Sequence, residues 1–155
     1  MKWVITTHVH YDRVASPWLI ERFIDPEAEF QFLARDQADQ IPADAIPLAF
    51  PGVELGPHDD EGPLFKKILV KYGLDDEALL VMAEVIQKGV DFVLHDFSPA
   101  PDDHYGQLAV GLVSFSDGML LVEESDRARL DLSYVVWDAI YELFKEGRQF
   151  RYRTA

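Results

Sequence analysis

The sequence predicts a mixed α+β fold that is mostly helical, with a small sheet formed by N-terminal strands. Three observations predict it: two strand-like runs lie within the first 33 residues, a proline-rich stretch follows them, and helical periodicity dominates from residue 63 onward. The chain has 155 residues, of which 48% are hydrophobic. This length and apolar content predict one domain, residues 1–155, around a single core.

The N-terminal elements follow from residue type and spacing. A β-branched and aromatic run predicts a strand at Lys2–Thr6. Alternation of polar and apolar residues predicts a second strand at Glu29–Leu33, which we expect to pair with the first. Between the two strands the sequence predicts a short helix, with Ser16 as its N-cap and Pro17 at its first position.

The rest of the chain is predicted to be loop and then helix. Residues 37–57 hold four prolines, which predicts a loop with at most a short strand at residues 46–50. The pair Lys88-Gly89 is a typical helix end, while residues 91–94 fit either a strand or a helical extension. The predicted helices span residues 63–71, 75–88, 105–115, 119–125 and 132–144.

Composition excludes several classes of function. The formal net charge is -14, with 28 acidic against 14 basic residues, so we expect no direct nucleic-acid binding. There are no cysteines, which excludes disulfides, thiolate metal ligands and cysteine nucleophiles. The apolar start is too short for a signal peptide or a membrane span, which predicts a cytoplasmic protein without membrane contact. The sequence is compatible with a homo-oligomer. The basic tail at Arg148, Arg151 and Arg153 is short enough to be a solvated end.

The densest polar cluster follows the first predicted strand. If the chain stays extended there, His8, His10 and Asp12 alternate onto one face at the end of the strand. Nitrogen and oxygen donors converging after a strand suit a divalent metal ion such as Zn, Mn, Fe or Ni, with an open position for water or substrate. A His-x-His pair beside an acid also arises by chance in an acidic chain, so a surface role is the alternative.

Arg13 has two interpretations. An ion pair with the neighbouring Asp12, or capping of the helix that starts near Ser16, would be structural. If the pair faces a cleft, Arg13 offers a bidentate donor to a carboxylate, a phosphate or another oxyanion. We therefore take Arg13 and Asp12 as candidate catalytic residues that act on a small anionic ligand.

Two further clusters offer metal ligands. His58 is followed by three acids in the irregular stretch before a predicted helix, where the alternative is an acidic helix N-terminus. Asp91 and His95 are four residues apart, so on a helix they lie on one face, one turn apart. The candidate metal ligands are therefore His10, His58, Asp91 and His95.

Residues 12–30 form a long continuous run, DRVASPWLIERFIDPEAEF. This run resembles the opening of the C-terminal domain of the ChrB chromate-resistance proteins. Residues 51–56, PGVELG, followed by His58, are similar to its G-V-E-L-G-H stretch, with Pro57 inserted. Three shorter segments fit the family more loosely, at residues 72–76, 90–91 and 137–141.

The resemblance implies a stand-alone version of that domain, concerned with chromate or another oxyanion. Ser16 stands where the family often carries a cysteine, and the chain has none, so no thiol role carries over. The larger regulators have a separate N-terminal half to which DNA binding is usually ascribed. The resemblance therefore does not imply a repressor here.

Three hypotheses for function follow. The leading one is a metal-binding domain, with an enzymatic or a binding role toward a small oxyanion, whose site forms where the first strand ends near the loop at His58. The second is an oxyanion sensor or interaction module without turnover, in which Arg13 binds the anion. The third is a structural module in which these polar residues are caps and ion pairs.

Overall fold

A small parallel sheet is built from the first third of the chain. The computed structural model describes residues 1–147. Strand β1 (Lys2–Thr6) lies between β2 (Glu29–Leu33) and β3 (Ala45–Leu48) and pairs in parallel with both. The predicted pairing of the first two strands is confirmed, and so is the mostly helical class with a small N-terminal sheet.

Helices make up most of the other described residues. Because a parallel pair needs a crossover connection, α1 links β1 to β2, and the 3-10 helix η1 lies between β2 and β3. The bounds are α1 Asp12–Phe23, η1 Arg35–Gln40, α2 Leu64–Lys71, α3 Glu77–Leu94, α4 His104–Val122 and α5 Asp126–Lys145. The predicted solvated tail at Arg148, Arg151 and Arg153 lies outside the described residues.

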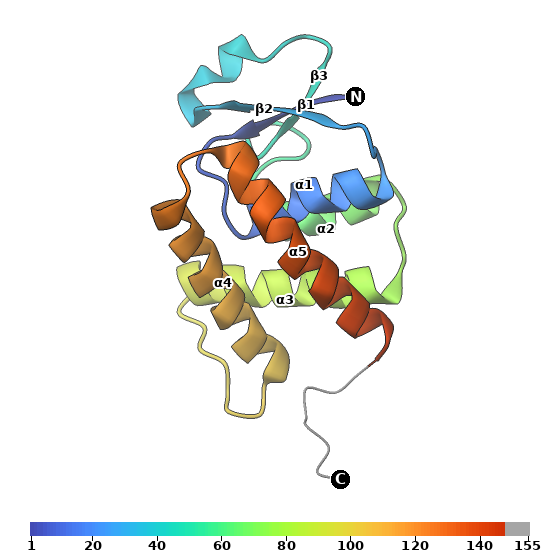
Figure 1. The fold of residues 1–155 in the computed structure, drawn as a ribbon, viewed down its shortest axis with the longest axis vertical. Helices are drawn as coiled ribbons and strands as arrows, with labels where there is room; N and C mark the ends of the chain where they lie inside the picture. The colour runs from blue at the N-terminus through green and yellow to red at the C-terminus, as the bar shows by residue number, and fades with distance from the viewer. Residues whose placement is uncertain (148–155) are drawn as a thin grey trace.

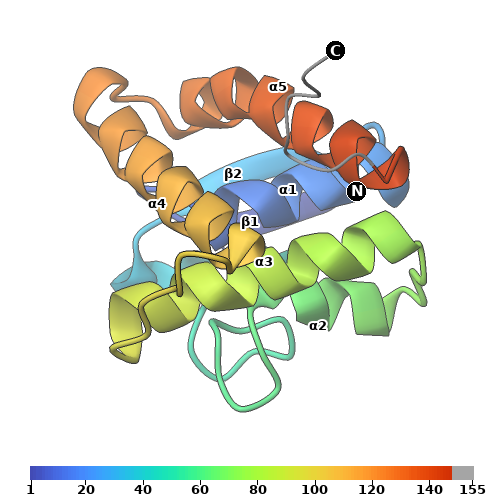
Figure 2. The same cartoon turned by 90° about the horizontal axis from the view of Figure 1, so that it is seen from below.

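The two faces of the sheet are covered differently. Successive strand residues point to opposite faces, so Trp3 packs into the main core with Trp18 of α1 and Trp137 of α5, each at most 2% exposed. Val4 points the other way and packs with Phe50 in a second, smaller cluster. Figure 1 shows the α-helices on one side of the sheet and η1 on the other, and Figure 2 shows the same helices from below.

Helix α1 begins five residues earlier than predicted, with Tyr11 as its N-cap, so Ser16 is not the N-cap. Ser16 lies fully buried inside the helix, and its hydroxyl donates to Oδ1 of Asp12 at 3.1 Å. Pro17 is also inside the helix. The Ser-Pro pattern misled because the buried hydroxyl finds its acceptor one turn earlier on the same helix, which satisfies it without a cap.

Helix α3 continues past the predicted end at Lys88-Gly89 to Leu94, so the ambiguous residues there are a helical extension. Gly89 serves close packing instead of a helix end. A Cβ at this position would overlap the hydroxyl and ring of Tyr11. The Tyr11 hydroxyl donates to the backbone carbonyl of Val85 at 2.7 Å, which fixes the ring against α3.

The last two helices are longer than predicted. The segments 105–115 and 119–125 belong largely to one helix, α4. Helix α5 begins six residues before the predicted start at 132, with Ser125 as its N-cap, whose hydroxyl accepts from the N–H of Ala128 at 3.3 Å. The apolar periodicity begins only after this polar first turn, so the sequence pattern does not show where the helix starts.

Helix α4 is apolar around most of its circumference. It is the one helix among residues 1–147 that is long and apolar enough to cross a membrane. Length and composition are the whole of this observation, and we assign α4 no membrane function from them.

Gly89→Ala will destabilise the protein, whereas Gly111→Ala will not. A methyl group at position 89 must displace Tyr11, an overpacking change that costs about 1–3 kcal/mol. Gly111 of α4 has open space around its Cβ position, so alanine there gains about 0.5–1 kcal/mol from helix propensity. Urea unfolding measures the free energy of unfolding of both variants. Equal values for the two variants would show that the Tyr11 contact does not limit the size of the residue at position 89.

Candidate functional site

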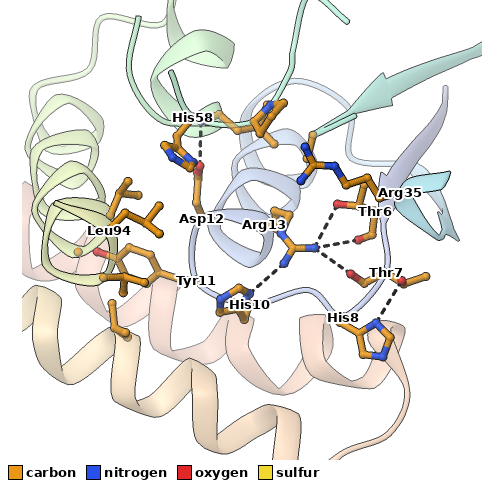
Figure 3. A pocket seen from close by; sticks show the side chains of 17 residues that line it. Thr6, Thr7, His8, His10, Tyr11, Asp12, Arg13, Arg35, His58 and Leu94 are labelled. Atoms are coloured by element: carbon orange, nitrogen blue, oxygen red, sulfur yellow. Dashed lines mark hydrogen bonds between the residues drawn. The ribbon is translucent and has the colours of Figure 1, made fainter. Parts of the chain in front are cut away.

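A cavity of about 490 Å³ lies at the carboxyl ends of the three strands. Thr6 ends β1, Arg35 follows β2, and Ala49 follows β3, and all three line it. The first turn of α1, the loop at His58, the start of α2, the end of α3 and Val113 of α4 also line it (Figure 3). The chain leaves β1 toward β2 and then crosses to β3 on the other side. Open parallel sheets bind ligands at such a switch in direction.

The residues between β1 and α1 leave the extended path, so the prediction that His8, His10 and Asp12 share one strand face is wrong. His8 and Tyr11 have positive φ angles of 59° and 51°, which turn the chain. Asp12 is already the first residue of α1. Asp126, in the first turn of α5, holds this loop by accepting from the N–H of His8 at 3.2 Å and of the next residue at 2.8 Å.

Arg13 lies in the cavity wall and makes no ion pair with Asp12. Its Nη1 donates to the backbone carbonyl of Thr7 at 2.8 Å and to the hydroxyl of Thr6 at 3.1 Å. Its Nη2 donates to Nδ1 of His10 at 3.1 Å. Within residues 1–147, Nε has no protein acceptor, so its N–H stays available for a ligand.

A second guanidinium, that of Arg35, lines the same cavity (Figure 3). Burial lowers the pKa of the Arg13 guanidinium, nearby carboxylates oppose this, and the charge of Arg35 adds to the lowering. The two cations are therefore within electrostatic reach of each other. Arg35 is exposed, and it has no hydrogen-bonded or ionic partner within the part of the chain that the structure describes.

His10 orients Arg13 as a neutral imidazole. A guanidinium has only donors, so Nδ1 of His10 is the unprotonated acceptor and the ring proton lies on Nε2. Burial lowers the pKa of His10, the Arg13 charge lowers it further, and Asp117 of α4 opposes the shift. His10 thus supports the guanidinium and keeps one N–H as a donor.

Asp12 holds the start of helix α2. Its carboxylate accepts from the backbone N–H of Leu64 at 2.8 Å and of Phe65 at 3.0 Å, and also from the Ser16 hydroxyl. The N-cap of α2 is Pro63, which has no side-chain cap to offer. Burial raises the pKa of the Asp12 carboxyl, and these hydrogen bonds oppose the rise. The contacts make Asp12 structural, and its catalytic role stays a prediction.

Three of the predicted metal ligands, His58, Asp91 and His95, lie in one region beside the cavity. The rings of His58, in the loop before α2, and His95, after α3, lie 6.3 Å apart between centroids. Nδ1 of His95 lies 2.8 Å from Oδ1 of Asp91, which confirms their predicted one-turn spacing. Gln87 donates to the same oxygen at 3.0 Å.

The fourth predicted ligand, His10, contacts Arg13 instead. Among residues 1–147, no group of three or more His, Cys, Asp or Glu side chains is placed to hold a metal ion. The carboxylate of Asp12 already accepts hydrogen bonds from the backbone N–H groups of α2. A metal centre built from His10, His58, Asp91 and His95 therefore stays a prediction.

Sequence reasoning missed Arg35, Tyr11 and Ala49 as cavity residues. Arg35 belongs to no motif, and only the shared edge of the parallel strands places it here. Tyr11 and Ala49 are buried and have positive φ angles of 51° and 66°. This backbone conformation costs roughly 1–3 kcal/mol in a non-glycine residue and tends to occur at functional sites.

Asp12→Ala will lower the free energy of unfolding by about 1.5–3 kcal/mol, the usual worth of hydrogen bonds to a charged group, because it leaves two N–H groups of α2 without an acceptor. Asp60→Ala, at an exposed position without a hydrogen-bonded partner among the described residues, is the matched control. Urea unfolding measures both. Equal losses for the two variants would refute the capping role.

Comparison with known sequences shows that the chain belongs to the family of ChrB C-terminal domains. A family model described as ChrB, C-terminal domain, matches residues 3–144. This confirms the predicted family and links the chain to chromate resistance. No solved structure matches the chain significantly.

Among curated proteins, the chain is similar to Protein ChrB of Cupriavidus metallidurans. The two are 38% identical over 76 residues. These residues are 49% of this chain and 22% of that protein, so the similarity spans about a fifth of the relative.

Proposed function

We propose that this domain binds a small oxyanion, held by Arg13 and Arg35 at the carboxyl edge of the sheet. The observation that carries the proposal is the presence of two guanidiniums on one cavity, neither paired with a carboxylate in the described residues. A guanidinium offers planar, bidentate donors that suit the oxygens of chromate, sulfate or phosphate.

The charge distribution supports this proposal. The chain has 28 acidic residues and a net charge of -14, so most of its surface repels anions. Two arginines on one cavity wall supply local positive charge, which a concave, low-dielectric wall focuses. Like charges repel each other, so the pair is more stable with an anion between them.

Backbone strain also supports a site here. Four non-glycine residues of the described chain have positive φ angles, and three of them, His8, Tyr11 and Ala49, line this cavity. Strain that the surrounding structure maintains at one place is a typical feature of ligand sites.

Binding without turnover fits these contacts better than catalysis. The Asp12 carboxylate accepts three hydrogen bonds and is not available as a general base. The loop beside Arg13 is bonded to Asp126 of α5, which also accepts from Arg129 at 2.9 Å. An anion on Arg13 can therefore act on α5 through this loop, as an oxyanion sensor in a chromate-resistance family requires.

Sulfate, phosphate, molybdate or chromate will raise the melting temperature of the domain. A ligand that binds only the folded state adds about 2.7 kcal/mol at one hundred times its Kd. For a chain of this size the corresponding rise in Tm is roughly 5–10 °C. Thermal unfolding at constant ionic strength, with chloride as the reference salt, measures the rise.

Arg35→Gln will abolish this rise without lowering Tm in chloride, because Arg35 has no protein partner in the described chain. Lys145→Gln removes the same charge from the exposed end of α5 and will keep the rise. No rise with any of the four anions, or a full rise in Arg35→Gln, contradicts the proposal.

A second candidate function, binding of a divalent metal ion, is favoured by the geometry of His58 and His95. Asp91 bonds Nδ1 of His95 and leaves Nε2 of that ring for a metal, an arrangement typical of metal-bound imidazoles. Two imidazoles at this separation supply two ligands, so water or the anion must complete the coordination of a Zn, Mn, Fe or Ni ion.

Elemental mass spectrometry of the protein, purified without chelator or nickel resin, tests the metal proposal. We expect about one metal ion per chain, because a bound structural metal copurifies with its folded site. His58→Ala and His95→Ala will lose it, whereas His104→Ala, at the exposed start of α4, will retain it. A substoichiometric content in the parent chain after incubation with each metal rejects this function.

A further inference from the structure

The cavity is much larger than a tetrahedral oxyanion. Its volume is about 490 Å³, within the range of sites that hold organic molecules. Five heavy atoms, at the share of about 30 Å³ that a water molecule takes in the liquid, fill about 150 Å³. An inorganic anion on Arg13 and Arg35 would therefore occupy only about a third of the space.

Besides the arginines and other polar residues such as Asp12, His10 and His58, the wall has an apolar part. Leu64 of α2, Val113 of α4 and the last turns of α3 line the cavity with hydrocarbon side chains. Figure 3 shows Leu94 at one end of the cavity and Arg35 at the other. Val93 and Leu94 are 56% and 54% exposed, so apolar surface at the wall is left for a ligand to cover.

The charged end and the apolar end belong to one cavity. A ligand that satisfies both has an anionic group for the guanidiniums and a hydrocarbon body that reaches α3 and α4. An inorganic anion uses the first end only, and a neutral hydrocarbon leaves the two cations without an anionic partner. Neither matches the whole site.

We infer that the oxyanion group bound here belongs to an amphiphilic organic acid, whose carboxylate lies on Arg13 and Arg35 and whose hydrocarbon part lies against Leu64, Val93 and Leu94. This inference rests on the proposed anion site and names the class of ligand for it.

Linear carboxylates from acetate to octanoate test the inference, with sulfate and the matching alcohols as references. Calorimetric titration of the parent chain measures each Kd. We expect Kd to fall about fourfold for each added methylene until the cavity is full, the factor that corresponds to burying one CH₂ group. The alcohols, which lack the charge, will bind more weakly than the carboxylates of equal length.

Two variants separate the ends of the cavity. Leu94→Gln will reduce the gain per methylene, whereas Leu121→Gln, 88% exposed near the end of α4 and absent from the cavity wall, will leave the gain unchanged. Arg35→Gln will weaken all carboxylates by a similar factor, because their charged group is the same.

The outcomes distinguish this inference from the proposal beneath it. Sulfate binding with no lower Kd for octanoate than for acetate overturns the inference and leaves the anion site in place. No binding of sulfate or of any carboxylate overturns both. A gain per methylene that Leu94→Gln leaves intact places the hydrocarbon elsewhere and also overturns the inference.

Discussion

The carboxylate of Asp12 is the interaction on which the site depends. Asp12 begins α1 directly after the loop from β1, and it accepts the first free N–H groups of α2 at Leu64 and Phe65. One side chain thus fixes the position of α2, and with it the end of the loop that carries His58, relative to the strand ends. Burial of the charge is unfavourable, and its three hydrogen bonds offset that cost.

Around this anchor, the cationic side of the cavity is preorganised. The carbonyl of Thr7, the hydroxyl of Thr6 and the imidazole of His10 hold the Arg13 guanidinium in one orientation. A donor held in place loses less entropy when a ligand binds, so its affinity for an anion rises. Arg35 has no such support in the described chain, and an anion would supply its partner.

The apolar side has a different origin. Gly89 lets the Tyr11 ring approach α3, and the Tyr11 hydroxyl is bonded to that helix. The loop after β1 and the last turns of α3 therefore lie next to each other, which places Val90 and Leu94 on the same cavity as the arginines. The mixed character of the cavity is a consequence of where these two segments meet.

The sequence by itself determined the family, the two N-terminal strands, the place of most helices and the spacing of Asp91 and His95, because composition, motif and periodicity are local properties. Tertiary structure decided the rest. Ser16 and Gly89 carry local signals of helix ends, which contacts with Asp12 and Tyr11 override. Arg35 reaches the cavity only because parallel strands end at one edge of the sheet, and pairing between distant segments sets that edge.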